Sequence, residues 1–172
     1  PGLVDLNNGW ARMKPEAKDL RLRDAQGREF AFTNGGIRVR FCRDSIKSSI
    51  LVLCLSLRGD ARSDAIERME FLYFPQTNGL DHLPALKLGY NRPGLPLSAR
   101  SVGTEYFHEP VPDGGEYTME LYAIGRTIIG RLNEHVVTGT VTSDAMRAGN
   151  VTLFSVHNGD FRDIEVINLD GL

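Results

Sequence analysis

Hydrophobic and polar residues alternate with a period of two along most of the chain, and an 11-residue helical period is found nowhere. In residues 36–42, Ile37, Val39 and Phe41 fall on one face of a strand, and polar residues fall on the other. Residues 50–57 are apolar on both faces, which is typical of a central strand covered on both sides. The pattern predicts a β protein with a helix content below ~15%.

The same alternation predicts further strands, separated by turn sequences. They cover residues 20–23, 30–32, 67–74, 85–90, 99–107, 116–124, 127–132, 135–141, 150–157 and 161–168. Turn residues rich in Gly, Asn, Asp and Pro mark positions 34–36, 78–79, 93–94, 112–115 and 158–159. About a dozen short, evenly spaced strands predict an antiparallel β-sandwich or barrel. Residues 63–68 and 143–147 could each form a single helical turn, which does not change the class.

The 172 residues fit one domain, since a domain takes roughly 100–200 residues. We therefore expect a single domain over residues 1–172. The chain begins at Pro1 rather than Met, so we expect it to be excised from a larger protein. Its longest apolar run, residues 50–55, is strand-sized, and its net charge is −2. We therefore expect neither membrane insertion by this segment nor general nucleic-acid binding.

Two local features can be predicted from the last third of the chain. Phe161 is out of phase with Ile164 and Val166, so all three reach one core only if a β-bulge lies between them. Residues 133–134, Asn-Glu, are suited to a two-residue hairpin turn, because Asn tolerates a positive φ.

Cys42 and Cys54 are too few for a disulfide scaffold and lack the partners of a zinc site. If residues 36–42 and 50–57 form a hairpin, the register with a loop over residues 43–49 places the cysteines about 13 Å apart. A disulfide tolerates Cα separations only up to about 7 Å. A tighter turn at residues 47–49 would place the cysteines opposite each other. We favour the longer loop because its residues are polar, and we expect two thiols.

The order of elements from residue 116 onwards is the most specific signal in the chain. A strand (116–125) is followed by a hairpin (126–137), a Gly-initiated strand (148–157) and a closing Phe-Arg-x-Ile-x-Val strand (161–166). This resembles the end of concanavalin A-like (laminin G/glucanase-type) jelly-roll domains. It is especially similar to bacterial 3-keto-disaccharide hydrolase-like domains, and similar domains are appended to bacterial receptor serine/threonine kinases.

The resemblance implies an all-β fold, an antiparallel β-sandwich of the concanavalin A-like jelly-roll type. It also implies an extracytoplasmic domain of a larger bacterial protein, with carbohydrate or another cell-envelope component as its ligand. The motifs that carry it mark a fold, and they transfer no active site.

Glucanases of this fold use a pair of carboxylates on one strand face, about 5 Å apart in retaining enzymes. Their Glu-x-Asp-x-x-Glu signature is absent here. Glu116 with Glu120, and Asp163 with Glu165, each share a strand face, but they alternate with apolar residues. We expect these carboxylates to lie in water. Nucleophile motifs, phosphate loops and metal-ligand histidine spacings are also absent, so we predict no catalytic residues, no metal site and no cofactor.

Sugar-binding sandwiches use exposed aromatic rings beside polar groups that bind hydroxyls. The predicted ligand-binding residues lie in the irregular stretch 75–96 and just after the strand at 99–107; they are Asp81, His82, Tyr90, Asn91, Arg92, Tyr106 and His108. For the two tyrosines, packing at the rim is an equal alternative. Trp10 is a further aromatic candidate. A set of arginines falls on solvent faces and could form an anion- or protein-binding face or a merely solvated one: Arg21, Arg23, Arg38, Arg40 and Arg58.

We therefore predict a non-catalytic recognition module that binds carbohydrate or another cell-envelope ligand, and a protein partner is also possible. A glycoside-cleaving enzyme of the 3-keto-disaccharide hydrolase type is one alternative, and a structural domain that mediates assembly is another. Clustered carboxylates in a cleft would favour the enzyme, and a large apolar patch would favour assembly.

Overall fold

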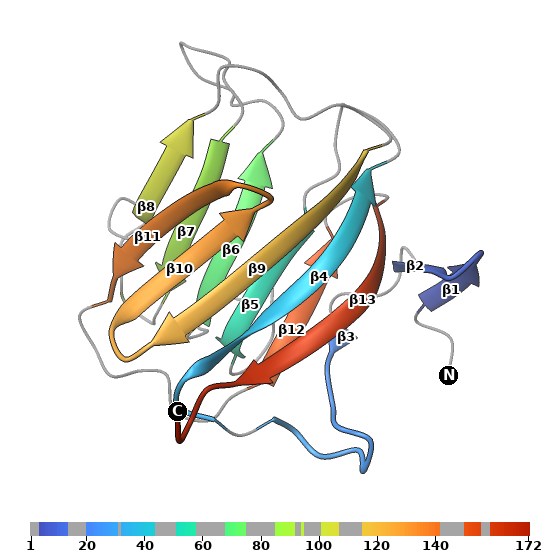
Figure 1. Cartoon of the computed structure of the whole chain (residues 1–172), viewed down its shortest axis with the longest axis horizontal. Coiled ribbons are helices and arrows are strands. Elements are labelled where there is room, and N and C mark those ends of the chain that lie inside the picture. The colour runs from blue at the N-terminus through green and yellow to red at the C-terminus, as the bar shows by residue number, and fades with distance from the viewer. Residues whose placement is uncertain are drawn as a thin grey trace.

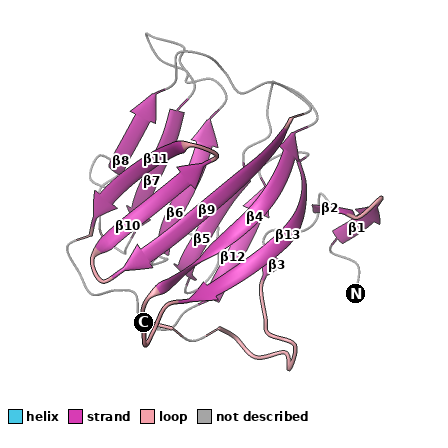
Figure 2. Cartoon of the chain, viewed as in Figure 1, coloured by secondary structure: helices cyan, strands magenta, loops and turns pink. Residues whose placement is uncertain are grey.

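In the part of the chain that the computed structural model describes, every regular element is a strand (Figure 2). The structure describes residues 4–13, 20–30, 32–43, 51–57, 68–74, 85–91, 94, 101–106, 115–141, 150–155 and 159–172. The strands are β1 (Val4–Asn7), β2 (Trp10–Met13), β3 (Leu20–Arg21), β4 (Gly35–Arg43), β5 (Leu51–Leu57), β6 (Arg68–Phe74), β7 (Ala85–Asn91), β8 (Ser101–Tyr106), β9 (Glu116–Ile124), β10 (Thr127–Leu132), β11 (His135–Thr140), β12 (Asn150–Ser155) and β13 (Gly159–Asn168).

The strands form two antiparallel sheets that lie one in front of the other (Figure 1). The seven-stranded sheet has the order β1-β2-β13-β4-β9-β10-β11, and the six-stranded sheet has the order β3-β12-β5-β6-β7-β8. The predicted antiparallel β-sandwich is confirmed. Of the predicted helical turns, at residues 63–68 and 143–147, only Arg68 is described, and it begins strand β6; the others lie outside the described residues.

The core lies between the sheets and is built by the alternation seen in the sequence. Ile37, Val39 and Phe41 of β4 point inward and are almost fully buried. Their neighbours on the adjacent strands do the same, and Phe71 of β6 and Phe161 of β13 complete the largest buried side chains. Since alternate residues of a strand point to opposite faces, the polar residues between them form the outer face of the seven-stranded sheet.

Glycines allow the two sheets to come close at one edge of the sandwich. A Cβ added to Gly103 of β8 would lie 2.6 Å from the Thr138 carbonyl oxygen, and one added to Gly139 of β11 would lie 2.7 Å from that of Val102. These strands are the edge strands of different sheets. Any side chain at either glycine would therefore separate β8 from β11.

Both local predictions for the last third of the chain are confirmed. The register of β13 against β4 shifts between Arg162 and Glu165, and Asp163 within this bulge has a φ of 50°. The bulge brings Phe161 and Ile164 to the same core. Asn133 stands in the turn between β10 and β11 with a φ of 51°, a conformation that Asn adopts more easily than most residues.

The predicted hairpin of residues 36–42 with 50–57 is wrong. β4 pairs with β13 and β9 in one sheet, whereas β5 pairs with β12 and β6 in the other, so the chain crosses between the sheets. Local alternation gives each strand its inward face but does not choose its partner. Cys42 lies on β4 beside outward-facing arginines, while Cys54 lies on β5 of the opposite sheet.

The sequence analysis also missed β1 and β2. The two strands have four residues each and form an antiparallel hairpin around Asn8 and Gly9, whose φ values are 49° and 79°. The Asn-Gly dipeptide was the signal that could have found this hairpin, because two-residue turns between strands favour these residues.

The C-terminal turn is tied to the start of β4. The Asp170 carboxylate accepts hydrogen bonds from the backbone N–H of Thr33 at 2.6 Å and of Asn34 at 2.7 Å. These bonds lower the pKa of Asp170, because they favour its ionised form. The Asn34 side chain in turn accepts a hydrogen bond from the N–H of Gly125 at 2.8 Å. Three segments distant in sequence are thus joined at the end of the seven-stranded sheet where the C-terminus lies (Figure 1).

In the part of the chain that the structure describes, no helix is long and apolar enough to cross a membrane.

Candidate functional site

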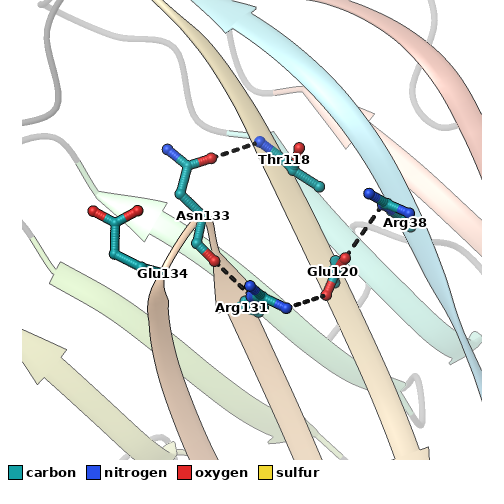
Figure 3. Close-up of a pocket in the computed structure, with 6 residues that line it drawn as sticks. All are labelled: Arg38, Thr118, Glu120, Arg131, Asn133 and Glu134. Atoms are coloured by element: carbon teal, nitrogen blue, oxygen red, sulfur yellow. Dashed lines mark hydrogen bonds and ion pairs between the residues drawn. The ribbon is translucent and has the colours of Figure 1, made fainter.

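The outer face of the seven-stranded sheet carries a hollow of about 290 Å³. Strands β4, β9 and β10 and the turn after β10 form it, and its lining is polar and charged throughout (Figure 3). The lining residues are Arg38, Thr118, Glu120, Arg131, Asn133 and Glu134. They gather here because the register sets Glu120 of β9 beside Arg38 of β4 on one side and Arg131 of β10 on the other.

Glu120 is the centre of the hollow. Its Oε1 lies 3.3 Å from Nε of Arg38, and its Oε2 lies 3.9 Å from Nη1 of Arg131 (Figure 3). The Glu120 side chain is only 11% exposed, whereas the Arg38 and Arg131 side chains are about half exposed. A nearly buried carboxylate needs such partners, because burying an unpaired charge costs several kcal/mol. The arrangement fixes one acceptor group between two accessible donor groups.

The turn after β10 forms the rim of the hollow. The Asn133 side-chain oxygen accepts a hydrogen bond from the backbone N–H of Thr118 at 3.0 Å, and the backbone N–H of Asn133 donates to the Thr118 carbonyl at 3.0 Å. Arg131 Nε donates to the Asn133 carbonyl at 2.6 Å, which holds the guanidinium beside Glu120. The adjacent Glu134 side chain is 83% exposed, and its Oε1 lies 3.9 Å from Nε2 of His135.

Tyr122 lies next to the hollow, two residues beyond Glu120 on the same face of β9. Its ring covers Gly36 of β4, where an added Cβ would come within 3.0 Å of Tyr122 Cε1. Partial burial, and then the nearby Glu120 charge, raise the pKa of the Tyr122 hydroxyl. The protonated hydroxyl can donate as well as accept a hydrogen bond.

A second charged cluster continues across the same face toward β2. The Glu116 carboxylate accepts hydrogen bonds from Arg40 at 2.6 Å and from Arg162 at 3.0 and 3.1 Å. The Arg162 guanidinium also lies 4.2 Å from the centre of the Trp10 ring, a cation–π distance. Arg12 forms a two-bond ion pair with Asp160 at 2.6 and 2.9 Å.

Donors and acceptors alternate over this face, and the positive and negative charges balance. Its arginines are Arg12, Arg38, Arg40, Arg131 and Arg162, and the acidic residues that pair with them are Glu116, Glu120, Asp160, Asp163 and Glu165. Among the described residues, no group of three or more His, Cys, Asp or Glu side chains is placed to hold a metal ion. Fixed charged donors and acceptors without a metal are suited to binding hydroxyl groups.

The expectation that the four sheet-face carboxylates lie in water is wrong for Glu120. Glu116, Asp163 and Glu165 are exposed, but the flanking arginines and the sheet surface cover Glu120. An outward position on a strand predicts exposure only where the neighbouring side chains are short, and here they are long.

The predicted arginine face does not form as one surface. Arg21 lies in β3 of the six-stranded sheet, whereas Arg38 and Arg40 lie in β4 of the other sheet. All three are exposed, as predicted, and so is Arg23. Arg58 lies outside the described residues.

The structure separates the two tyrosines among the predicted ligand-binding residues. Tyr90 of β7 is only 4% exposed and packs in the core, which favours packing over ligand contact among the roles left open. Tyr106 is 56% exposed but lies at the opposite end of the β7–β8 pair, opposite Ala85. Asn91 ends β7. The other four predicted residues, Asp81, His82, Arg92 and His108, lie outside the described residues.

Among the residues of the hollow, only Arg38 was predicted to belong to a possible binding face, while Glu120 was expected to lie in water and residues 133–134 to form a turn. Thr118, Arg131 and Asn133 belong to strands and a turn that were predicted correctly, but none of them stands out in composition or motif. Outward alternation on β9 and β10 was the available signal. It became specific only with the register that places Arg38, Glu120 and Arg131 on three adjacent strands.

The fold defined by these two sheets is that of the galectin-like and related lectin-type jelly rolls. A protein of unknown function with a galectin-like fold from Bacillus subtilis has a TM-score of 0.70 at 10% identity, over 96% of this chain and 85% of that one. Carbohydrate binding module CBM66 from the same organism has a TM-score of 0.61 at 11% identity, over 98% and 92% of the chains. The VIP36 exoplasmic/lumenal domain in its Ca²⁺/Man-bound form has a TM-score of 0.68 at 10% identity, over 99% and 82%.

No family model matches the chain, and no curated protein matches it in sequence. The likeness to these solved structures therefore defines the fold. The expected relation to 3-keto-disaccharide hydrolase-like and kinase-appended domains stays a prediction.

Proposed function

We propose that this domain is a non-catalytic carbohydrate-binding module that holds a neutral sugar in the hollow around Glu120. The observation that carries the proposal is the nearly buried Glu120 carboxylate between two half-exposed arginine side chains. A carboxylate accepts hydrogen bonds from sugar hydroxyls, and guanidinium groups donate to hydroxyl oxygens. Two structures of the same fold are a carbohydrate-binding module and a Man-bound domain, which supports this class of ligand.

The charge balance favours a neutral sugar over an acidic one. Within the hollow, Arg38 and Arg131 are offset by Glu120 and Glu134. An acidic sugar would have to replace Glu120 as the partner of the arginines, and would then leave that carboxylate buried and unpaired. A neutral sugar adds hydrogen bonds without breaking the existing pairs.

The wider context of the proposal follows the resemblance noted in the sequence. We place the domain in a larger bacterial extracytoplasmic protein, where it would bind carbohydrate of the cell envelope or its surroundings. The irregular stretch 75–96 and residues Tyr106 and His108 remain a proposed second contact region.

A neutral-and-acidic glycan array, followed by calorimetric titration of the best binder, tests the proposal. Glu120→Gln should weaken binding about tenfold or more, since a hydrogen bond to a charged group contributes about 1.5–3 kcal/mol. Glu29→Gln is the matched control, because Glu29 is also an arginine-paired glutamate but lies away from the hollow. Its affinity should equal that of the wild type.

Raising the salt concentration should change the affinity little, because the ligand carries no charge. The proposal fails if no glycan binds, or if Glu120→Gln and Glu29→Gln bind equally well. A preference for acidic glycans with steep salt dependence would refute the neutral ligand.

A further inference from the structure

From the outer face of the seven-stranded sheet we infer that Trp10 and Arg162 form a second sugar position, so that the ligand is an oligosaccharide lying across the strands. This inference rests on the proposed function and specifies the length and direction of its ligand. Trp10 is the only tryptophan of the chain, and its side chain is half-buried on the sheet face rather than packed in the core.

Trp10 is held in place by charged partners. The Arg162 guanidinium lies 4.2 Å from the ring centre, and its Nη2 donates to both carboxylate oxygens of Glu116. The guanidinium lies over one face of the ring, so a sugar would contact the remaining exposed part of the half-buried ring together with the hydrogen-bonding groups of Arg162 and Glu116. An apolar ring surface next to hydrogen-bonding groups suits a sugar, which has an apolar face and a rim of hydroxyls.

Trp10 and the hollow lie on one line across the sheet. Phe161 pairs with Ala11, so Arg162, the next residue of β13, lies opposite Trp10. Arg162 also pairs with Arg40 on its other side. Arg40 in turn pairs with Thr118 at the edge of the hollow. The strands β2, β13, β4 and β9 are successive neighbours in the sheet (Figure 1). Three interstrand spacings separate Trp10 from Thr118, which is about 14 Å. One monosaccharide cannot touch both ends.

The surface between the two ends can bind hydroxyl groups. Arg40 and Glu116 occupy it, and their side chains are both about two-fifths exposed. Each is already ion-paired within the face, Arg40 with Glu116 and Asp163, and Glu116 with Arg40 and Arg162. The middle of the line is therefore neutral and polar, like the hollow, and suits the same class of ligand.

Tryptophan fluorescence tests the inference, because Trp10 is the sole emitter of its kind. The probes are neutral hexose series based on glucose, mannose, galactose and fructose, each from the monosaccharide to the tetrasaccharide. In the series that binds, the longer members should bind about tenfold more tightly than the monosaccharide and change the Trp10 emission. The monosaccharide should bind in the hollow and leave the emission unchanged.

Variants measured by calorimetry complete the test. Trp10→Ala should remove the gain of the longer sugars without altering the affinity for the monosaccharide, and Trp10→Phe should keep part of the gain. Ile124→Ala, which removes an exposed apolar side chain at the end of β9, is the control and should change neither affinity. The unchanged monosaccharide affinity shows that the Trp10 variants keep their fold.

The outcomes separate this inference from the function on which it rests. If binding requires Glu120 but is equally tight for monosaccharide and tetrasaccharide, with no change in emission, the second position is refuted and the module remains. If Tyr106→Ala, a variant of the other proposed contact region, removed the gain of the longer sugars and Trp10→Ala did not, the second position at Trp10 would also be refuted. If no glycan binds, both the function and the inference fail.

Discussion

Replacing Gly130 by alanine should destabilise the domain, although alanine is the smallest possible addition. Gly130 lies in β10 with its missing side chain facing the core. An added Cβ would stand 2.5 Å from Cε2 of Phe71 and 2.9 Å from Cδ2 of Leu88. Carbon atoms pack at about 3.5–4.0 Å, so the methyl group overlaps Phe71 by about 1 Å.

The ring cannot move away at low cost. Phe71 and Leu88 are fully buried, and both belong to strands paired on either side in the six-stranded sheet. Overpacking of this kind costs about 1–3 kcal/mol, and we expect a value near 2. For a chain of this length, about 2 kcal/mol lowers the Tm by roughly 4–8 °C.

The measurement is urea unfolding followed by far-UV circular dichroism, on the wild type, Gly130→Ala and Thr127→Ala. Thr127 is an exposed residue of the same strand, so Thr127→Ala should stay within about 0.5 kcal/mol of the wild type. The double variant Gly130→Ala/Phe71→Leu should be more stable than the sum of the two single changes predicts, because the smaller side chain makes room. A Gly130→Ala protein as stable as the wild type would show that the ring does not fill this space.

Two further predictions concern acid stability and the cysteines. Because the pKa of Asp170 is lowered in the folded state, its stabilising effect is complete above the unfolded pKa of about 3.8 and is lost as the pH falls through the lower folded value. Urea unfolding should find Asp170→Asn less stable than the wild type at pH 7, and this difference in stability should close below pH ~4. A difference that does not depend on pH would contradict this reasoning. Cys42 and Cys54 belong to opposite sheets, and Cys42 faces outward. Thiol titration of the unreduced, denatured protein should therefore find two thiols, and the intact mass should show no loss of two hydrogens. A count of zero thiols would show a disulfide.

The strands were predictable because their information is local. β9 and β10 begin and end at the residues that alternation gave, and the bulge after Phe161 followed from the phase of three apolar residues. The partners of each strand were not predictable in this way. Consecutive strands such as β4 and β5 look like a hairpin in sequence, and only the packing of the whole sandwich sends them to different sheets.

The candidate site depends on that missing information. Arg38, Glu120 and Arg131 are far apart in sequence, and each alone is an ordinary charged residue on an outward face. Aromatic residues drew attention instead, and Tyr90 shows the weakness of that signal, since an aromatic ring within an alternating strand packs in the core as readily as it meets a ligand. A site made from the middle of a sheet becomes visible only with the register.

The position of the last strand has a consequence for how the domain assembles. β13 lies between β2 and β4, and it supplies hydrogen bonds to both. During synthesis the ribosome releases β2 and β4 long before β13, so the two early strands cannot take their final places in the sheet until residues near the C-terminus have emerged. Pairings between such distant parts of a chain also make folding slow, because the loop must close before its contacts form. The face that carries Trp10 and Arg40 is therefore among the last parts of the molecule to be completed.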